Sequence, residues 1–447
     1  MPRICDVAIV GGGIGGLTLA IGLAKGRLGV QIYEQDAELR EIGAGVALGG
    51  NATRLLTELG VELTPVANVP PTLEFRRWKD GELLWSHPIG DWYRQETGAP
   101  YLTLHRSTLR HQLAAAVPSE SIHLNHRLSG VAEESGGVHL QFDRGHDVFA
   151  RVVVGADGVN STVRRYVCGT VSPIYSGEIG FRGVIPTEKS PALPVPTSLH
   201  IWYGPRTHAV FYGMDRGELV NLLAVYEPDR LPEWTRSSSR APATTDQALS
   251  IFERYGWDGR ILDLVRNIEG DMNFWALVDL PRLPRWSRGR VVILGDAAHA
   301  PLPHQGQGAG QAIEDAYTLG RILVDRSLDD YAATFDTFER HGKAGRRGSR
   351  RIHDSPEDHT SLPATERRNA IWIGRRFRSV SDGFIAIERK RRCAFDDLPT
   401  TIMGSLRNWQ ATPGIIYVRS LCFGSSLGLP PAGSSTSSSA TKGHFTS

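Results

Sequence analysis

The first forty residues alternate between short apolar runs and a segment with helical spacing. Residues 7–10 form an apolar run typical of a buried strand, and residues 17–23 carry apolar side chains at the intervals expected of a helix. Between them the chain reads GGGIGG, and a second apolar run at residues 30–33 ends in Glu34. This pattern predicts a strand, a tight glycine turn, a helix and a second strand.

Two patterns then alternate along the chain. The strand–helix alternation continues to about residue 175 and returns near residue 286, as in a Rossmann-like α/β domain. Between these positions, short aromatic-rich strands separated by proline-rich loops predict a mostly antiparallel inserted sheet. We therefore expect four regions: 1–175, 176–285, 286–335 and 336–447. The first and third form the α/β domain and the second is the inserted domain.

Local signals place further elements within these regions. Asp80-Gly81 predicts a hairpin, and we expect this hairpin, within residues 70–100, to join the inserted sheet. The other predicted elements are a loop at 42–48, a helix at 51–59 with Asn51 as N-cap, a helix at 105–113, strands at 181–184, 199–203, 208–213, 219–226 and 291–294, and helices at 246–255 and 311–324. Residues 336–447 are basic and then Gly/Ser-rich, and we expect them to be divergent and poorly ordered.

Composition narrows the class of protein. The chain has 447 residues, is 40% hydrophobic and carries a net charge of +2, so no global field favours nucleic acid or a membrane surface. Its four cysteines are scattered, which favours a reducing compartment and predicts neither disulfides nor a metal site. Because the first strand begins near the N-terminus and no apolar run is long enough to span a bilayer, we expect a cytoplasmic protein without membrane insertion.

The glycine turn has the spacing of a dinucleotide-binding motif. Gly11 permits the turn, Gly13 lets the backbone approach a pyrophosphate, and Gly16 lets helix and strand pack closely. The N-terminus of the following helix presents free N–H groups to the phosphates. Glu34 stands where an acid accepts hydrogen bonds from a ribose diol, so the stretch predicts a bound dinucleotide.

Further motifs follow in order along the chain. Together with the glycine turn, this ordered set resembles the single-component FAD-dependent aromatic hydroxylases, in particular the salicylate-hydroxylase-like branch. The resemblance runs from residue 4 to about residue 330. Its motifs are EIGAG at 41–45, His105-Arg106, GADG at 155–158, YSG at 175–177, FRG at 181–183, GDAAH at 295–299, GQG at 306–308 and EDA at 314–316.

The resemblance implies an α/β fold with an FAD-binding domain of the p-hydroxybenzoate hydroxylase type and an inserted β-sheet domain for substrate. By resemblance, Asp296 binds the ribityl chain of FAD, although it can also be a helix N-cap. Asp157 sits beside the pyrophosphate, with a loop-fixing role as the alternative, and Arg106 neutralises the phosphates. Further cofactor contacts come from two loops, at Gly45 and Ala47 and at Gly306, Gly308 and Ala309. In the second loop, a helix N-terminus faces the pyrimidine edge of the flavin.

The chemistry of that family implies non-covalent FAD, with NAD(P)H and O2 as co-substrates. NAD(P)H reduces the flavin, O2 adds at C4a, and the hydroperoxide transfers an OH group to an electron-rich ring. No second glycine-turn unit is present for a nicotinamide dinucleotide, which favours transient NAD(P)H contact. We expect a monooxygenase, monomeric or homodimeric, that hydroxylates a small salicylate-like or polyketide-type aromatic compound.

A candidate base lies on an aromatic strand of the inserted domain. His208 and Tyr212 are four residues apart and therefore share one face of a strand. A base near neutral pKa speeds the hydroxylation of a phenol, and some hydroxylases of this type place a His-x-x-x-Tyr pair on the substrate hydroxyl. A buried structural histidine is the competing interpretation. Arg182 is a further predicted catalytic or pocket residue.

One departure from the family's pattern concerns the C-terminal region. After Tyr331, the closing helix that packs on the flavin domain in the family is not recognisable from motifs. Two alternatives to the hydroxylase therefore stay open. One is a flavin-dependent epoxidase or dearomatising oxygenase, and the other is a non-catalytic flavin-binding protein with a defective C-terminal region.

Overall fold

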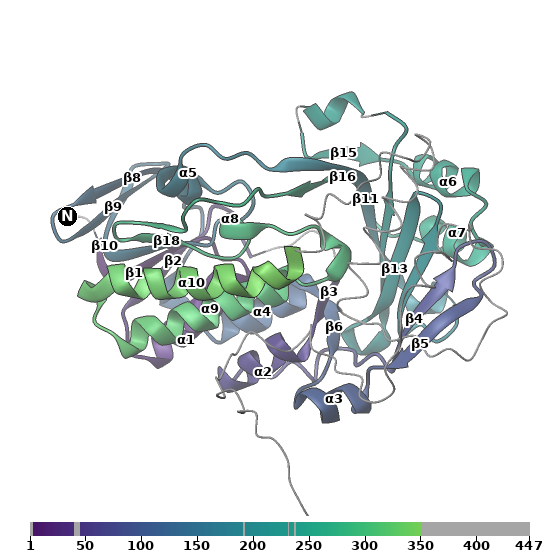
Figure 1. Cartoon of the computed structure of the whole chain (residues 1–447), viewed down its shortest axis with the longest axis horizontal. Coiled ribbons are helices and arrows are strands. Elements are labelled where there is room, and N and C mark those ends of the chain that lie inside the picture. The colour runs from purple at the N-terminus through teal and green to yellow at the C-terminus, as the bar shows by residue number, and fades with distance from the viewer. Residues whose placement is uncertain (1–2, 40–44, 191–192, 231, 237, 351–447) are drawn as a thin grey trace, which may run out of the picture.

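The computed structural model describes residues 3–39, 45–190, 193–230, 232–236 and 238–350. Figure 1 shows two large sheets: a helix-covered sheet on the left and a second sheet with long strands on the right. A short two-stranded sheet, β3 (Gly45–Leu48) paired with β6 (Leu102–His105), lies between them.

The first sheet is parallel at its centre, in the order β17-β18-β10-β1-β2-β7. Its inner strands read as continuous apolar runs, because a parallel sheet covered on both faces buries both sets of side chains. A β8–β9 hairpin pairs antiparallel with β10. The strands are β1 (Arg3–Val10), β2 (Val30–Tyr33), β7 (Ile122–His123), β8 (Leu128–Glu134), β9 (Gly137–Phe142), β10 (His146–Gly155), β17 (Ser287–Arg288) and β18 (Val291–Ile293).

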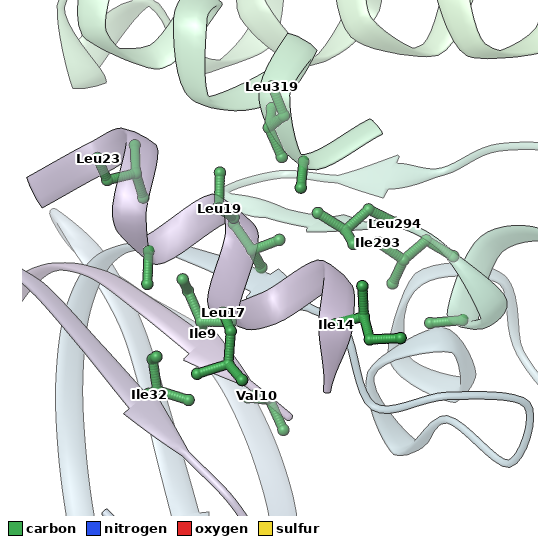
Figure 2. Close-up of a cluster of buried hydrophobic side chains, with 14 of the residues drawn as sticks. Ile9, Val10, Ile14, Leu17, Leu19, Leu23, Ile32, Ile293, Leu294 and Leu319 are labelled. Atoms are coloured by element: carbon green, nitrogen blue, oxygen red, sulfur yellow. The ribbon is translucent and has the colours of Figure 1, made fainter. Parts of the chain in front are cut away.

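Helices α1 and α9 pack against each other over this sheet. Leu17 and Leu19 of α1 are fully buried, and Figure 2 shows them between Ile9 and Ile32 of the sheet and Leu319 of α9. The helices of this domain are α1 (Ile14–Lys25), α2 (Gly50–Glu58), α4 (Arg106–Ala115), α5 (Thr162–Cys168), α8 (Asp296–His299), α9 (Gly308–Asp325) and α10 (Tyr331–Arg350), with α3 (Asp91–Thr97) beside β5.

The second sheet runs β15-β16-β11-β14-β13-β12-β4-β5 and is antiparallel except between β12 and β4. One face packs against α6 (Thr245–Arg254) and α7 (Gly259–Arg266), which bury Phe252 and Ile261 against it. The other face is turned toward the first sheet. The strands are β4 (Thr72–Arg77), β5 (Leu83–Pro88), β11 (Ile174–Pro186), β12 (Leu199–Gly204), β13 (Thr207–Met214), β14 (Leu219–Tyr226), β15 (Arg240–Ala243) and β16 (Met272–Asp279).

Two local predictions are wrong. Asn51 is not an N-cap: α2 begins at Gly50 after Gly49, and the Asn51 side chain instead donates to Glu314 of α9 at 3.0 Å. Residues 45–48, predicted as part of a loop, form strand β3, while 40–44 lie outside the described residues. In both cases a partner distant in sequence decides the local structure.

A closing helix does follow Ser327, beginning at Tyr331, although the family's motif for it is not recognisable in the sequence. Helix α10 packs on α9 and buries Phe335 and Phe338, each 1% exposed. Glu339 accepts a hydrogen bond from the backbone N–H of Trp286 at 2.9 Å, which anchors the helix to the segment before β17. The boundary expected at residue 335 therefore falls inside α10, and residues 351–447 lie outside the described residues. The helical spacing of the apolar residues in this segment indicates the helix, although the family's motif is missing.

Within the described ranges, no helix is long and apolar enough to cross a membrane.

Candidate functional site

The glycine turn between β1 and α1 has the geometry its spacing predicts. Gly11 has φ +107°, and a Cβ at this position would lie 2.4 Å from the carbonyl oxygen of Ala156. A Cβ at Gly16 would lie 2.0 Å from the carbonyl oxygen of Gly11, so only glycine permits this approach of helix to strand. A Cβ at Gly13 would meet no atom of the described ranges within 4 Å. The backbone at Gly13 therefore faces open space at the helix N-terminus, where a pyrophosphate fits.

Glu34 is held under this turn by a buried arginine. Its Oε2 accepts hydrogen bonds from the Gly12 N–H at 2.8 Å and from Arg110 Nη2 at 3.1 Å. Arg110 also donates to the Gly12 carbonyl at 2.9 Å, and Oε1 of Glu34 accepts from the Asp36 N–H at 3.0 Å. Both side chains are less than 10% exposed. Arg110 was not predicted from sequence, and the only signal was its place four residues after Arg106 on the same helix.

We expect Arg110→Leu to destabilise the protein. Removing one partner of a buried ion pair leaves Glu34 charged and uncompensated, which typically costs about 3 kcal/mol or more. Chemical unfolding should show this loss, and FAD should be released at lower denaturant concentration. The matched control is Arg165→Leu, which removes an exposed arginine of α5 and should change stability by less than about 0.5 kcal/mol. Equal stability of the two variants would contradict the proposed role of Arg110.

The carboxylate of Asp157 is occupied by helix α5. It accepts hydrogen bonds from the Ser161 hydroxyl, from the Thr162 N–H at 2.7 Å and from the Val163 N–H at 3.1 Å. Burial raises the pKa of Asp157, and these hydrogen bonds oppose the rise. These three hydrogen bonds agree with the loop-fixing alternative, while a direct contact between Asp157 and FAD stays a prediction.

The GDAAH segment is tied to α9 by a buried pair. Gly295, with φ +57°, is the N-cap of α8, so Asp296 is the first helical residue and not its N-cap. His299 Nε2 lies 2.5 Å from Asp315 Oδ2, and the Gly295 N–H donates to the same oxygen at 3.0 Å. Burial raises the pKa of Asp315 to about 7. His299 therefore links α8 to α9, whereas the side chain of Asp296 is half-buried.

The second glycine loop leads into α9. Helix α9 begins at Gly308, three residues earlier than predicted, and its first N–H groups have no intrahelical acceptor. Gly306 is in the left-handed region with φ +62°, and a Cβ there would lie 3.9 Å from the Cβ of Ala47. Ala47 of strand β3 and Gly306 of the loop before α9, which are far apart in sequence, thus lie side by side. The N-terminus of α9, which includes Ala309, is the positive end of the helix dipole. A positive end suits the anionic pyrimidine edge of a reduced flavin.

One face of the second sheet carries all three residues predicted for catalysis. Thr207, Ala209 and Phe211 point toward α6 and α7, so His208, Val210 and Tyr212 point the other way, toward the first domain. The strand registers align three rows on that face. They are Gly180–Val225–His208–Tyr203, Arg182–Leu223–Val210–Ile201–Phe75 and Val184–Asn221–Tyr212–Leu199–Leu73. His208 and Tyr212 are thus about 13 Å apart along the strand, with Arg182 in the row between them, two strands away.

Tyr212 lies against the edge of β3. A Cβ at Gly45 would lie 2.7 Å from the Tyr212 hydroxyl, and the Gly45 N–H donates to Asn221 Oδ1 at 2.7 Å. Burial raises the pKa of Tyr212, with Arg182 and Arg106 opposing the rise. Tyr212 therefore stays protonated and can donate a hydrogen bond near neutral pH. Asn221, which sequence reasoning missed, locks β3 onto this face.

Arg182 is a half-buried cation with no anion beside it in the described part of the chain. Among the described residues, its guanidinium has no hydrogen-bond or ion-pair partner. Burial lowers the pKa of Arg182, and the nearby positive charge of Arg106 lowers it further. Arg106 thus lies near the substrate face, while the arginine on the glycine turn itself is Arg110. A poorly exposed guanidinium such as that of Arg182, with no partner among the described residues, favours a bound anion.

His208 is 3% exposed and meets a residue of the flavin-side loop. Its ring centroid lies 6.1 Å from that of Tyr203 and 5.4 Å from that of His304, which precedes Gly306. His304 Nε2 in turn lies 2.7 Å from Glu178 Oε2 of β11. Neither His304 nor Glu178 was predicted as a site residue, because nothing local in the sequence indicates that they meet.

No group of three or more His, Cys, Asp and Glu side chains is arranged to hold a metal ion in the described ranges. A recess of about 210 Å³ between α2 and the α3–β6 segment is lined by Arg54, Glu58 and Arg94 among others, and contains none of the predicted site residues.

The chain matches proteins of known activity over most of its length. A sequence profile described as an FAD binding domain matches residues 4–341. The chain is 34% identical over 375 residues to 6-hydroxynicotinate 3-monooxygenase of Bordetella bronchiseptica, covering 83% of this chain and 94% of that protein. It is 34% identical over 330 residues to a 3-amino-4-hydroxybenzoate 2-monooxygenase of Streptomyces platensis, covering 73% and 81% of the two chains. A salicylate hydroxylase substrate complex superposes with a TM-score of 0.65 at 26% identity, covering 83% and 95%.

Proposed function

The chain belongs to the FAD-dependent aromatic hydroxylases, and on that premise we propose that it hydroxylates a phenolic ring that carries a carboxylate. The observation that carries this proposal is the unpartnered guanidinium of Arg182 on the same sheet face as His208 and Tyr212. The relatives named for hydroxynicotinate and aminohydroxybenzoate act on rings with both a hydroxyl and a carboxylate, which agrees with this choice.

The described residues fit FAD. Gly13 leaves space at the N-terminus of α1, Glu34 Oε1 has acceptor capacity left for a ribose hydroxyl, and the first N–H groups of α9 are open. We propose that Gly11, Gly16, Asp157, Asp296 and Arg106 complete this binding site, with Gly45, Ala47, Gly306, Gly308 and Ala309 beside the flavin ring. FAD supplies the redox chemistry with NAD(P)H and O2 when bound.

In this proposal, the side chains on the sheet face have different roles toward the substrate. The row of Leu223, Val210 and Ile201 offers an apolar floor for the ring. Arg182 binds the carboxylate through charge-assisted hydrogen bonds. His208 accepts the proton of the phenol, which makes the ring more electron-rich, and the protonated Tyr212 hydroxyl donates a hydrogen bond that orients the substrate.

A matched substrate panel tests the proposal. Hydroxybenzoates should stimulate NAD(P)H oxidation and give products that contain one atom from labelled O2, as seen by mass spectrometry. The corresponding hydroxybenzamides should stimulate it far less. Equal stimulation by acids and amides would refute the proposal that the substrate carries a carboxylate. Flavin without any turnover would favour the non-catalytic alternative, and an epoxide or dearomatised product would favour the other oxygenase.

We expect Arg182→Met to raise KM for the carboxylate substrate about 10- to 100-fold, because a hydrogen bond to a charged group contributes about 1.5–3 kcal/mol. The response to the amide should stay the same, since that ligand does not depend on the charge. The control is Arg254→Met, which removes an exposed arginine on the far side of the sheet. An unchanged KM for the acid in Arg182→Met would remove this residue from the substrate site.

A further inference from the structure

His304 connects the loop before α9 with two side chains of the substrate sheet. It lies in the short helical turn Pro303–Gln305, immediately before Gly306. Its Nε2 lies 2.7 Å from Glu178 Oε2, and its ring centroid is 5.4 Å from that of His208. Glu178 and Arg182 share one face of β11, so this carboxylate belongs to the same face as the proposed base. His304 is therefore a neighbour of both His208 and Glu178.

The contact with Glu178 favours the tautomer of His304 that carries its proton on Nε2. Its Nδ1 is buried and has no hydrogen-bond partner among the described residues. When the Nε2–H donates to Glu178, the lone pair is on Nδ1, and this nitrogen can accept a proton. A carboxylate behind an imidazole fixes the tautomer in this way and stabilises the imidazolium that forms on protonation.

The proton taken from the substrate has to leave a buried position. His208 is only 3% exposed, whereas the side chains of His304 and Glu178 are 16% and 12% exposed. Next to Glu178, Gly177 has open space around its Cα, since a Cβ there would meet no atom within 4 Å. The pair therefore lies between the buried base and a more open part of the surface.

We propose that His304 and Glu178 form a proton-transfer pair that carries the substrate proton away from His208. This inference rests on the proposed role of His208 as the base. The phenol O–H bond breaks and the proton binds the His208 imidazole. His208 then gives up a proton to His304 Nδ1, directly or through one water. The Glu178 carboxylate stabilises the His304 imidazolium until its Nε2 proton passes to solvent, which returns all three side chains to their starting charge.

The test follows ionisation of a coloured phenol on the enzyme. The oxidised, FAD-loaded protein is mixed rapidly with 4-hydroxy-3-nitrobenzoate at a pH below the pKa of its hydroxyl. Phenolate absorbance reports ionisation, and a pH indicator reports the proton released. His304→Asn keeps an amide N–H to bond Glu178 but cannot relay a proton. Glu178→Gln keeps a similar shape without the charge.

We expect both variants to retain FAD and thermal stability and to release the proton on the order of 100-fold more slowly than the unmodified enzyme. Added imidazole should restore the rate in His304→Gly. The matched control is His139→Asn. This variant removes a histidine of β9 that pairs with Asp147 of β10, outside the site, and it should not change the rate.

The outcomes separate the two proposals. If His208→Ala abolishes ionisation while His304→Asn releases the proton to the indicator at the normal rate, the relay is refuted and the base stands. If His208→Ala ionises the probe normally, the base itself is wrong and the relay fails with it. If His304→Asn loses FAD and imidazole does not restore the rate in His304→Gly, His304 only clamps the loop, and the relay is refuted.

Discussion

His208→Ala should uncouple NAD(P)H oxidation from hydroxylation. The side chain lies on the face of β13 that is turned toward the first domain and is not among the residues that we propose for FAD binding, so flavin reduction should be largely preserved. Without the base the ring stays a less reactive phenol, and oxygen transfer slows on the order of 100-fold. NAD(P)H consumption should then yield mainly H2O2. Product, peroxide and melting temperature are measured on one preparation.

The matched control is His200→Ala. His200 is fully buried on the neighbouring strand β12 but faces the helix side, with its Nδ1 3.3 Å from Glu74 Oε2. Its loss should lower stability by roughly 1–3 kcal/mol, because it leaves a buried carboxylate short of a partner, while coupling stays normal. If His208→Ala behaves like this control, with reduced stability and intact coupling, His208 is a structural residue.

Gly13→Ala should abolish most FAD binding without destabilising the apoprotein. A Cβ at Gly13 meets no atom of the described residues within 4 Å, so a ligand at the N-terminus of α1 is what we expect it to meet. A methyl group there displaces the pyrophosphate from the helix N–H groups. The loss of one or two charge-assisted hydrogen bonds should weaken FAD binding about 10- to 1000-fold. Fluorescence titration of apoprotein with FAD, beside chemical unfolding, measures both quantities.

Two further glycine variants make this prediction specific. Gly259→Ala also adds a methyl group to open space in the first turn of a helix, α7, and should change neither FAD binding nor stability appreciably. Gly16→Ala places a Cβ 2.0 Å from the Gly11 carbonyl oxygen and should destabilise the apoprotein by roughly 1–3 kcal/mol or more through overpacking. Normal FAD affinity in Gly13→Ala would exclude the pyrophosphate from this turn.

The family and cofactor predicted from the sequence are confirmed by the profile match over residues 4–341 and by the relatives. These predictions succeeded because a dinucleotide-binding turn is formed by residues that are close together in the sequence. Residues 11–16 need particular backbone angles and close approaches within one strand–turn–helix unit, so glycines at fixed spacing carry the signal. The shared face of His208 and Tyr212 was equally local, since alternation along one strand determines it.

The sequence by itself therefore determined the fold class, the dinucleotide turn and the residue types available at the strand ends. Only the tertiary structure decided which of them meet. Arg110 lies under Glu34 because α4 packs on α1, and Asn221 holds Gly45 because β14 and β3 approach across two domains. His304 reaches Glu178 and His208 although 126 and 96 positions separate them. Helix α10 likewise closes the core through Phe335 and Phe338, not through the missing motif. The physical reason is that side-chain burial and residue pairing depend on strand register and helix packing. These bring together residues that are far apart in the chain, so no regular spacing in the sequence indicates which of them meet.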